Sequence, residues 1–270
     1  MRGLILAIAV LITQQQAASR ILLATVTLGS RAVVDIGIDD FVVEQGGAPG
    51  EVLDVHVADY PIIVLVDSGS ASEGEHAAIL DAASRFVTRV GERPIGAGTL
   101  AAPPEMFANF DDERSDVLAR IKQVAPAPTS AALEAIAQAT RAIERSESPF
   151  SAIVVLSSQG VDPASLKSTD ELPSIINSRI PVHVIARREA TVPGAAAPDV
   201  LREVSELTHG QYTTIYTQAS YGIALDRLAD RLATEVMVQF LVPPKVPATS
   251  DVRAGVKIPG AKVIGLGVSK

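Results

Sequence analysis

The chain has 270 residues, 47% of them hydrophobic, and its 31 acidic and 23 basic side chains give a net charge of −8. This length allows one large or two small domains with a sizeable core. The acidic balance, without long blocks of one sign, argues against a nucleic acid as partner. The sequence has no cysteine, which excludes disulfides, thiolate metal sites and cysteine nucleophiles.

The first residues have the order of an export signal. Arg2 provides a positive charge, residues 3–12 form an apolar core, and small residues suited to cleavage follow. The alternative is an ordinary N-terminal strand or helix, but the segment shows neither alternation nor amphipathic periodicity. We therefore predict a signal peptide over residues 1–19, a secreted or periplasmic protein, and no stable membrane span.

The next segment, residues 20–57, is predicted to be rich in short strands. Gly29 and the pair Gly46 and Gly47 are natural turn sites between its apolar stretches. The predicted strands cover residues 21–28, 32–38, 41–44 and 51–57.

Residues 58–233 alternate between apolar runs and amphipathic segments. Residues 62–66 are apolar without a break, as expected of a parallel strand that is covered on both faces. Gly210 is expected to end one of the helices. Further strands are predicted at 95–100, 152–156 and 182–186, and helices at 72–90, 116–124, 131–144, 171–178, 199–208 and 221–232. The alternation predicts an α/β fold with a doubly wound, mostly parallel, Rossmann-type sheet.

In the C-terminal segment, residues 234–270, apolar residues recur at every second position. Val236, Val238 and Phe240 alternate with the residues between them, which is typical of a half-buried strand. Further strands are predicted at 252–258 and 263–268. Because neither end of the chain has enough strands to bury an apolar face alone, we predict that this segment pairs with residues 20–57 in one small β domain.

Oxygen-bearing side chains directly follow the apolar run 62–66. Asp67, Ser68 and Ser70 lie where this strand is expected to end. Ligands of open α/β sheets bind just beyond the carboxyl ends of the strands, so these side chains form a candidate binding site. The alternative is a tight Ser-Gly turn that leads into the next helix.

Residues 67–70 resemble the first motif of von Willebrand factor A-type (VWFA) domains, Asp-x-Ser-x-Ser, which begins a metal-ion-dependent adhesion site for Mg²⁺. Other segments extend the resemblance to secreted bacterial VWFA-related proteins: DDFVVE at 39–44, IPVHVI at 180–185, and parts of 201–212 and 228–260. The resemblance implies a VWFA-like domain flanked by β segments, with protein binding as its function.

The pattern departs from the VWFA motifs at two carboxylates. Aligning the two serines places Val66 where the essential aspartate belongs, whereas aligning Asp67 requires one residue to be missing. Gln159 stands where the motif after a later strand has a second aspartate, and a neutral amide cannot balance the charge of Mg²⁺. We therefore expect no cofactor or, at most, weak Mg²⁺ binding. The resemblance implies these ligands for a degenerate metal site: Asp67, Ser68, Ser70 and Thr129.

Thr129 corresponds to the threonine of the second VWFA motif. The alternative role for it and for Ser130 is capping of the helix at 131–144, because side-chain oxygens often accept hydrogen bonds there. If no metal binds, the same edge can recognise a partner through hydrogen bonds from Ser68, Ser70, Thr129 and Gln159.

Catalytic signatures are missing from the sequence. There is no Gly-x-Ser-x-Gly elbow, and the four histidines have no metal-ligand spacing. His183 lies within an apolar strand and is expected to be a core residue. The sequence thus favours an exported, non-catalytic protein-binding or scaffold module, and the alternative is a hydrolase of unrecognised type that uses the same sheet edge.

Overall fold

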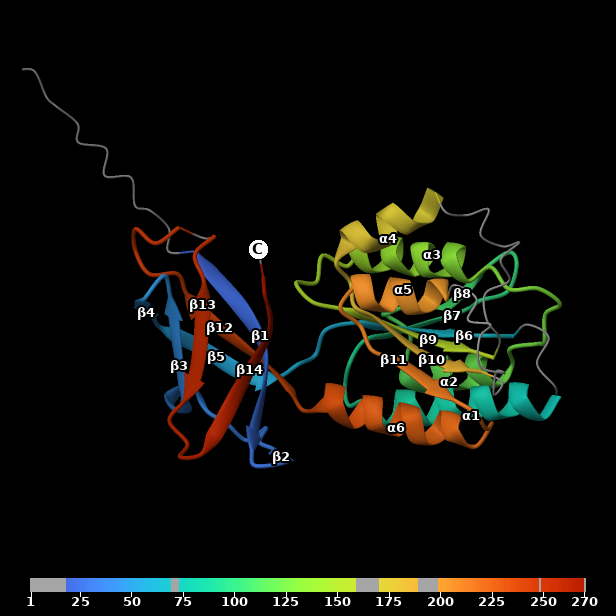
Figure 1. The fold of residues 1–270 in the computed structure, drawn as a ribbon, viewed down its shortest axis with the longest axis horizontal. Coiled ribbons are helices and arrows are strands. Elements are labelled where there is room, and N and C mark those ends of the chain that lie inside the picture. The colour runs from blue at the N-terminus through green and yellow to red at the C-terminus, as the bar shows by residue number, and fades with distance from the viewer. Residues whose placement is uncertain (1–17, 69–72, 159–169, 189–198, 248, 270) are drawn as a thin grey trace, which may run out of the picture.

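The computed structural model describes residues 18–68, 73–158, 170–188, 199–247 and 249–269. Two parts lie side by side (Figure 1). One part is built around a six-stranded sheet with helices on both faces, and the other consists of two small antiparallel sheets. The parallel strands of the larger part run away from the small sheets, so their carboxyl ends lie at the far end of the molecule.

The six-stranded sheet has the order β11-β10-β9-β6-β7-β8 and is parallel except at β8, which runs antiparallel to β7. Its four longest strands are buried over nearly their whole length, which explains their unbroken apolar sequences. The predicted α/β fold with a mostly parallel sheet is therefore confirmed. The strands are β6 (Ile62–Val66), β7 (Ile95–Thr99), β8 (Met106–Ala108), β9 (Ala152–Ser157), β10 (Val182–Arg187) and β11 (Tyr212–Ile215).

Helices cover both faces of this sheet (Figure 1). Alternate side chains of β6 point to opposite faces, so Val64 packs with α1, α2 and α6, and Leu65 packs with α3, α4 and α5. These two clusters form the core of the larger part. The helices are α1 (Glu73–Arg89), α2 (Arg114–Lys122), α3 (Ala132–Glu144), α4 (Leu172–Ser178), α5 (Val200–Leu207) and α6 (Ser220–Ala233).

The small sheets combine strands from both ends of the described chain. In the first sheet, β1 pairs with β12 and β14, and β5 pairs with the other edge of β12. Side chains such as Leu22, Phe41 and Val238 form a third core cluster between the sheets. The domain boundaries at residues 57 and 233 remain predictions. The strands are β1 (Ser19–Leu28), β2 (Arg31–Ala32), β3 (Phe41–Gln45), β4 (Ala48–Gly50), β5 (Val52–Val57), β12 (Glu235–Leu241), β13 (Val252–Val256) and β14 (Ala261–Val268).

Two local predictions were wrong. The strand predicted at 32–38 is reduced to the two residues of β2, and a 3₁₀ helix, η1 (Ile38–Asp40), follows. The Asp40 carboxylate accepts a hydrogen bond from the Gly37 amide at 3.0 Å, a local bond that favours the turn over an extended chain. The short strands β4, β8 and β11 were not predicted.

Gly210 contributes to the end of α5 as predicted, but it is not the left-handed residue there. The left-handed residue that ends α5 is His209, with φ of 59°, and the Gly210 amide closes the helix end by donating to the Ser205 carbonyl at 2.8 Å. A Cβ atom on Gly210 would lie 2.0 Å from the Val182 carbonyl oxygen. Glycine is therefore required at this position by a close backbone approach.

A buried polar cluster lies where the chain passes between the two parts. Tyr60 precedes β6, Glu235 begins β12, and the Tyr60 hydroxyl donates to Glu235 at 2.5 Å. The Arg93 guanidinium stacks over the Tyr60 ring at 4.2 Å, lies 3.8 Å from the Glu235 carboxylate and donates to the Leu232 carbonyl. We call Tyr60, Arg93 and Glu235 the joint cluster. Among the described residues, no helix combines the length and apolar character needed to cross a bilayer.

Candidate functional site

The structure places two of the predicted site residues together at the carboxyl edge of the large sheet. Asp67 and Ser68 directly follow β6, and each is only 2% exposed. Thr129 lies in the loop before α3 and is exposed. Ser70 and Gln159 lie outside the described residues.

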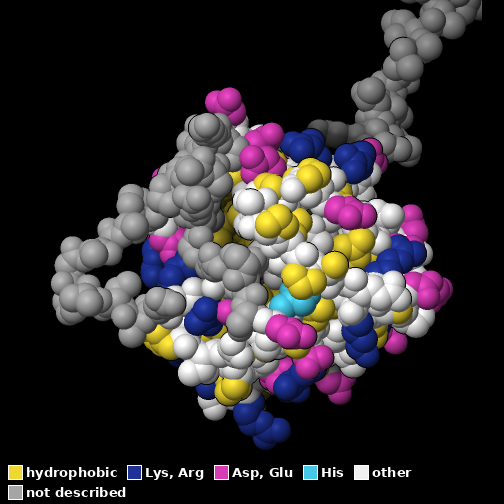
Figure 2. Space-filling view, turned by 90° about the vertical axis from the view of Figure 1, so that its right-hand side faces the viewer, with side chains coloured by type: hydrophobic (Ala, Val, Ile, Leu, Met, Phe, Trp, Pro, Cys, Tyr) yellow, Lys and Arg dark blue, Asp and Glu magenta, His cyan; other side chains and the backbone are white. Residues whose placement is uncertain are grey.

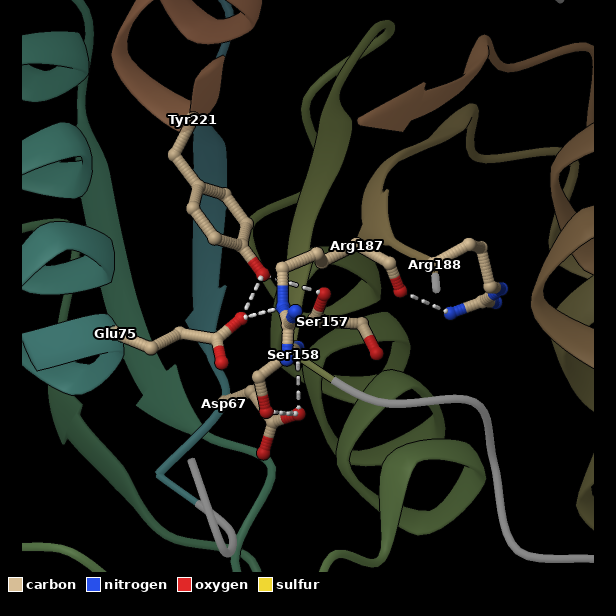
Figure 3. A network of polar contacts seen from close by, with 7 residues as sticks. All are labelled: Asp67, Glu75, Ser157, Ser158, Arg187, Arg188 and Tyr221. Atoms are coloured by element: carbon tan, nitrogen blue, oxygen red, sulfur yellow. Dashed lines mark hydrogen bonds and ion pairs between the residues drawn. The ribbon is translucent and has the colours of Figure 1, made fainter. Parts of the chain in front are cut away.

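The Asp67 carboxylate is bound to the end of the neighbouring strand β9. Its Oδ2 atom accepts hydrogen bonds from the backbone amide and the hydroxyl of Ser158, both at 2.9 Å (Figure 3). The Asp67 amide in turn donates to the Leu156 carbonyl at 2.9 Å. Asp67 therefore continues the contact between β6 and β9 beyond their last paired residues.

Ser68 lines a pocket of about 430 Å³ at the same edge. Its Oγ atom is buried and has no hydrogen-bond partner among the described residues, and the same is true of Thr99 Oγ1 in the same pocket. Phe107, Arg120 and the loop at residues 123–127 form other walls. The Ser68 carbonyl accepts from the Ala127 amide at 2.7 Å, which fixes this loop beside β6. The pocket thus combines two hydroxyls that lack partners in the described part of the chain with walls that are partly apolar and partly charged, through Glu105 and Arg120.

The described residues visible on the carboxyl face have a mixed character. Figure 2 shows hydrophobic side chains and a histidine across the middle of this face, with acidic and basic side chains around them. Thr129 contributes its carbonyl to this region by accepting from the Ala102 amide at 3.2 Å. Helix α3 begins after Ala131, and no side chain caps it, so capping is not the role of Thr129 or Ser130.

Three residues that the sequence analysis missed form a charged network beside Asp67 (Figure 3). Arg187, the last residue of β10, donates from Nε to Oε1 of Glu75 in the first turn of α1. The hydroxyl of Tyr221, in the first turn of α6, donates to the Ser157 carbonyl at 2.9 Å and lies 3.2 Å from the same Glu75 oxygen. Glu75 is 1% exposed, so this is a buried carboxylate with two donors.

A sequence signal exists for only one of these residues. Arg187 follows a buried apolar strand, so the rule that sites lie at carboxyl ends of strands points to it as it does to Asp67. Glu75 and Tyr221 occur in first turns of amphipathic helices, where a polar side chain is ordinary. Only the packing of α1 and α6 on one face brings them together.

The charges of this network act on the Tyr221 hydroxyl. Burial, together with the negative charges of Glu75 and Asp67, raises the pKa of Tyr221 well above its usual value, and Arg187 partly opposes this. Tyr221 is therefore a neutral hydrogen-bond donor under physiological conditions.

Comparisons with known proteins bear on the fold. No protein-family model matches the sequence, and no curated protein matches it significantly. The structure is similar to a von Willebrand factor type A protein from Catenulispora acidiphila, with a TM-score of 0.57 and 10% identity over 95% of this chain and 74% of that one. It is also similar to the vWF domain of the type V pili tip protein Mfa5 from Porphyromonas gingivalis, with a TM-score of 0.51 and 9% identity over 65% of this chain and 95% of that domain.

The chain has the VWFA fold. The resemblance drawn from residues 67–70 and the later segments is confirmed at this level. Because the identities are so low, the comparison shows the fold alone, and any conclusion about function depends on the site itself.

The described part of this candidate site does not by itself fit Mg²⁺. The ion requires octahedral oxygen ligands at about 2.0–2.1 Å, and carboxylates usually provide its charge balance. Asp67 Oδ2 already accepts two hydrogen bonds, and Glu75 is paired with Arg187. Among the described residues, no three histidine, aspartate or glutamate side chains lie close enough together to hold an ion. Ser68 Oγ is the one described oxygen of the predicted set that is buried without a partner.

Proposed function

We propose that this chain is an exported, non-catalytic protein-binding or scaffold module of the VWFA type, which binds a protein partner at the carboxyl edge of its large sheet. Magnesium contributes weakly or not at all in this proposal. The VWFA fold and the general position of ligands in α/β sheets support the choice of this edge. The pocket of Ser68 and Thr99 is the observation that carries the proposal.

Two buried hydroxyls that have no partner within the described ranges are costly in a free protein. Each unsatisfied buried group costs about 1–3 kcal/mol, which a partner recovers when it provides the missing hydrogen bond. Ser68 and Thr99 line a pocket with both apolar and charged walls, and each hydroxyl carries one donor and acceptor positions. A polar side chain of a protein partner, carried on an apolar segment, matches this combination.

Hydrolysis at the same edge is less well supported. A serine nucleophile requires a base within hydrogen-bond reach, and Ser68 Oγ has no hydrogen-bond partner among the described residues. The Ser158 hydroxyl does donate to the Asp67 carboxylate. The Ser158 backbone amide donates to the same oxygen, so the pair of bonds is a structural contact between strand ends and not a nucleophile with its base. The proposed module is therefore non-catalytic.

Export is the third part of the proposal. Strand β1 begins at Ser19, and Arg20 is fixed by hydrogen bonds from its guanidinium to the Ser269 carbonyl. Cleavage after residue 19 would remove only Ser19 from β1 and would keep Arg20 and the rest of the strand. The predicted signal peptide itself lies almost entirely outside the described residues.

A comparison of pocket variants tests the binding surface. Protein from residue 19 onward would be used to capture partners from the exported fraction of its source cells, with Ser68→Ala and Thr99→Val as pocket variants. Ser115→Ala is the matched control, because Ser115 is an exposed residue of α2 that does not line the pocket. We expect a partner that the wild type and the control retain and that both pocket variants lose. Equal capture by all four proteins would refute binding through this pocket.

A further inference from the structure

Two buried carboxylates lie at the carboxyl edge of the large sheet, on elements that follow each other in the chain. Asp67 comes at the end of β6, and Glu75 comes in the first turn of α1. Moving a carboxylate from water into a protein interior costs several kcal/mol unless positive charge and hydrogen bonds compensate. The structure compensates Asp67 with the two hydrogen bonds from Ser158 and Glu75 with an ion pair.

Arg187 brings the cation of that ion pair from a distant strand. It ends β10, which is separated from β6 by β9, and its side chain crosses toward α1 to reach Glu75 (Figure 3). The side chain is 27% exposed, whereas the Glu75 side chain is 1% exposed. The guanidinium thus enters from the surface and ends on a buried carboxylate.

Neutral donors complete the coordination of both carboxylates. Ser158 provides its amide and hydroxyl to Asp67, and Tyr221 provides its hydroxyl to Glu75. A divalent ion at this place would have to displace such donors and would be repelled by the guanidinium. Removing the guanidinium, in contrast, would leave two negative charges that suit a divalent ion.

We propose that the guanidinium of Arg187 is an internal substitute for a divalent cation, which keeps the carboxyl edge of this VWFA fold charged and ordered without metal. Where the edge binds a partner, this inference rests on the proposed function. The role of Arg187 in the free protein does not depend on any partner.

Thermal unfolding of charge variants tests the inference. The melting temperatures of the wild type, Arg187→Gln and Arg187→Lys would be measured with a chelator, with millimolar Mg²⁺ and with millimolar Mn²⁺. Arg188→Gln is the matched control, because Arg188 is the next residue and forms its own ion pair with Asp199 at 2.7 Å. The melting temperature is measured on the free protein, so this test does not depend on any binding assay.

For the wild type, Arg187→Lys and Arg188→Gln, we expect the melting temperature of each protein in metal to equal its own melting temperature in chelator. Arg187→Gln should melt about 10 °C lower than the wild type in chelator, because the buried Glu75 carboxylate loses the guanidinium that forms its ion pair. Mg²⁺ or Mn²⁺ should restore several degrees of that loss. A wild type that is stabilised by metal as strongly as Arg187→Gln, or a folded Arg187→Gln without a metal response, would overturn the inference.

A double variant covers the case in which Arg187→Gln does not fold. Arg187→Gln with Glu75→Gln removes both charges of the ion pair, so it should fold and show no metal response. If it also fails to fold, the charge of Arg187 is not what the edge requires, and the inference is wrong. Loss of partner capture with unchanged melting behaviour would instead refute only the proposed function.

Discussion

The two ends of the large sheet contain the same three residue types in different settings. At the amino end, the joint cluster combines Tyr60, Arg93 and Glu235, and at the carboxyl end Tyr221, Arg187 and Glu75 form the second set. In each set a tyrosine hydroxyl and an arginine approach one buried glutamate. The Arg93 side chain is 1% exposed and lies against the Tyr60 ring, whereas Arg187 reaches its glutamate from the surface.

The difference indicates different roles. The joint cluster lies where the chain crosses to the small sheets, so its full burial fixes one part against the other. The carboxyl-end set has a second carboxylate, Asp67, and a pocket with unsatisfied hydroxyls beside it. A closed cluster of this kind stabilises a fold, and an open one can respond to a ligand or an ion. Variants at the two ends of the large sheet can test whether the two clusters have these different roles.

The largest effect is expected from deleting residues 19–57. This change removes β1 and β5, which pair with both edges of β12, and β3, which pairs with β13. The apolar faces of β12 and β14 would then be exposed on unpaired edges, which promotes aggregation. Light scattering during gel filtration should show large aggregates. A deleted protein that stays monomeric and melts at the wild-type temperature would mean that the small sheets do not support the rest of the molecule.

Replacing Arg93 with alanine should cost about 3–5 kcal/mol of the free energy of unfolding, because Glu235 would remain as a buried charge without its cation. Urea denaturation would measure this loss. The control is Arg85→Ala, which breaks an ion pair with Asp226 whose arginine side chain is 62% exposed. Surface pairs contribute about 0–1 kcal/mol, so equal losses in the two variants would remove the distinction between buried and exposed pairs.

The fold was predictable from the sequence to a larger extent than the site. Unbroken apolar strands such as 62–66 and amphipathic helices such as 72–90 were recognised because the spacing of their apolar residues identifies each of them. The strand at 32–38 failed because a local bond to Asp40 decides its conformation. Asp67 and Ser68 were found from the end of an apolar run, but Glu75 and Tyr221 meet only through the packing of two helices.

The amino end also contains a histidine whose protonation is linked to folding. His183 is buried in β10, and its Nδ1 accepts from the Gln211 amide at 2.9 Å. Burial and the charge of Arg231 lower the pKa of His183 from 6.5 to about 3. Between these values the unfolded chain binds more protons than the folded one, so stability falls as the pH decreases from 6.5 toward 3.

The expected slope from His183 is about 1.4 kcal/mol per pH unit within that range. Burial raises the pKa of Glu235. At pH values above the usual pKa of glutamate, this shift makes stability rise as the pH decreases, which is opposite in sign to the effect of His183. The comparison of wild type with His183→Gln separates the two, because Glu235 is present in both proteins. Urea denaturation across the range should show a flatter acid dependence in His183→Gln. Parallel curves for the two proteins would show that His183 titrates normally in the folded state.

The smallest effect concerns metal binding at the carboxyl end. The wild type should bind Mg²⁺ with a dissociation constant in the millimolar range or weaker, which corresponds to about 4 kcal/mol or less. Gln159→Asp restores the missing carboxylate of the motif and should strengthen binding by about tenfold, or 1.4 kcal/mol. The gain should be larger when Arg187→Gln is added, because the guanidinium no longer repels the ion. Ser70→Ala in the wild type should change little.

Isothermal titration with Mg²⁺ and Mn²⁺ would measure these differences, and Val66→Asp extends the series at the other displaced carboxylate. The variants differ in the charge of the site and not in its hydroxyl oxygens. Ser68 and Thr129 are present in every variant, and only the substitutions to aspartate and at Arg187 change the charge. Micromolar binding of Mg²⁺ by the wild type that disappears in Asp67→Ala would contradict the series. That result would mean that the Asp67 carboxylate leaves Ser158 to bind the ion, and that the carboxyl end of the sheet is a metal site like those of the complete motif.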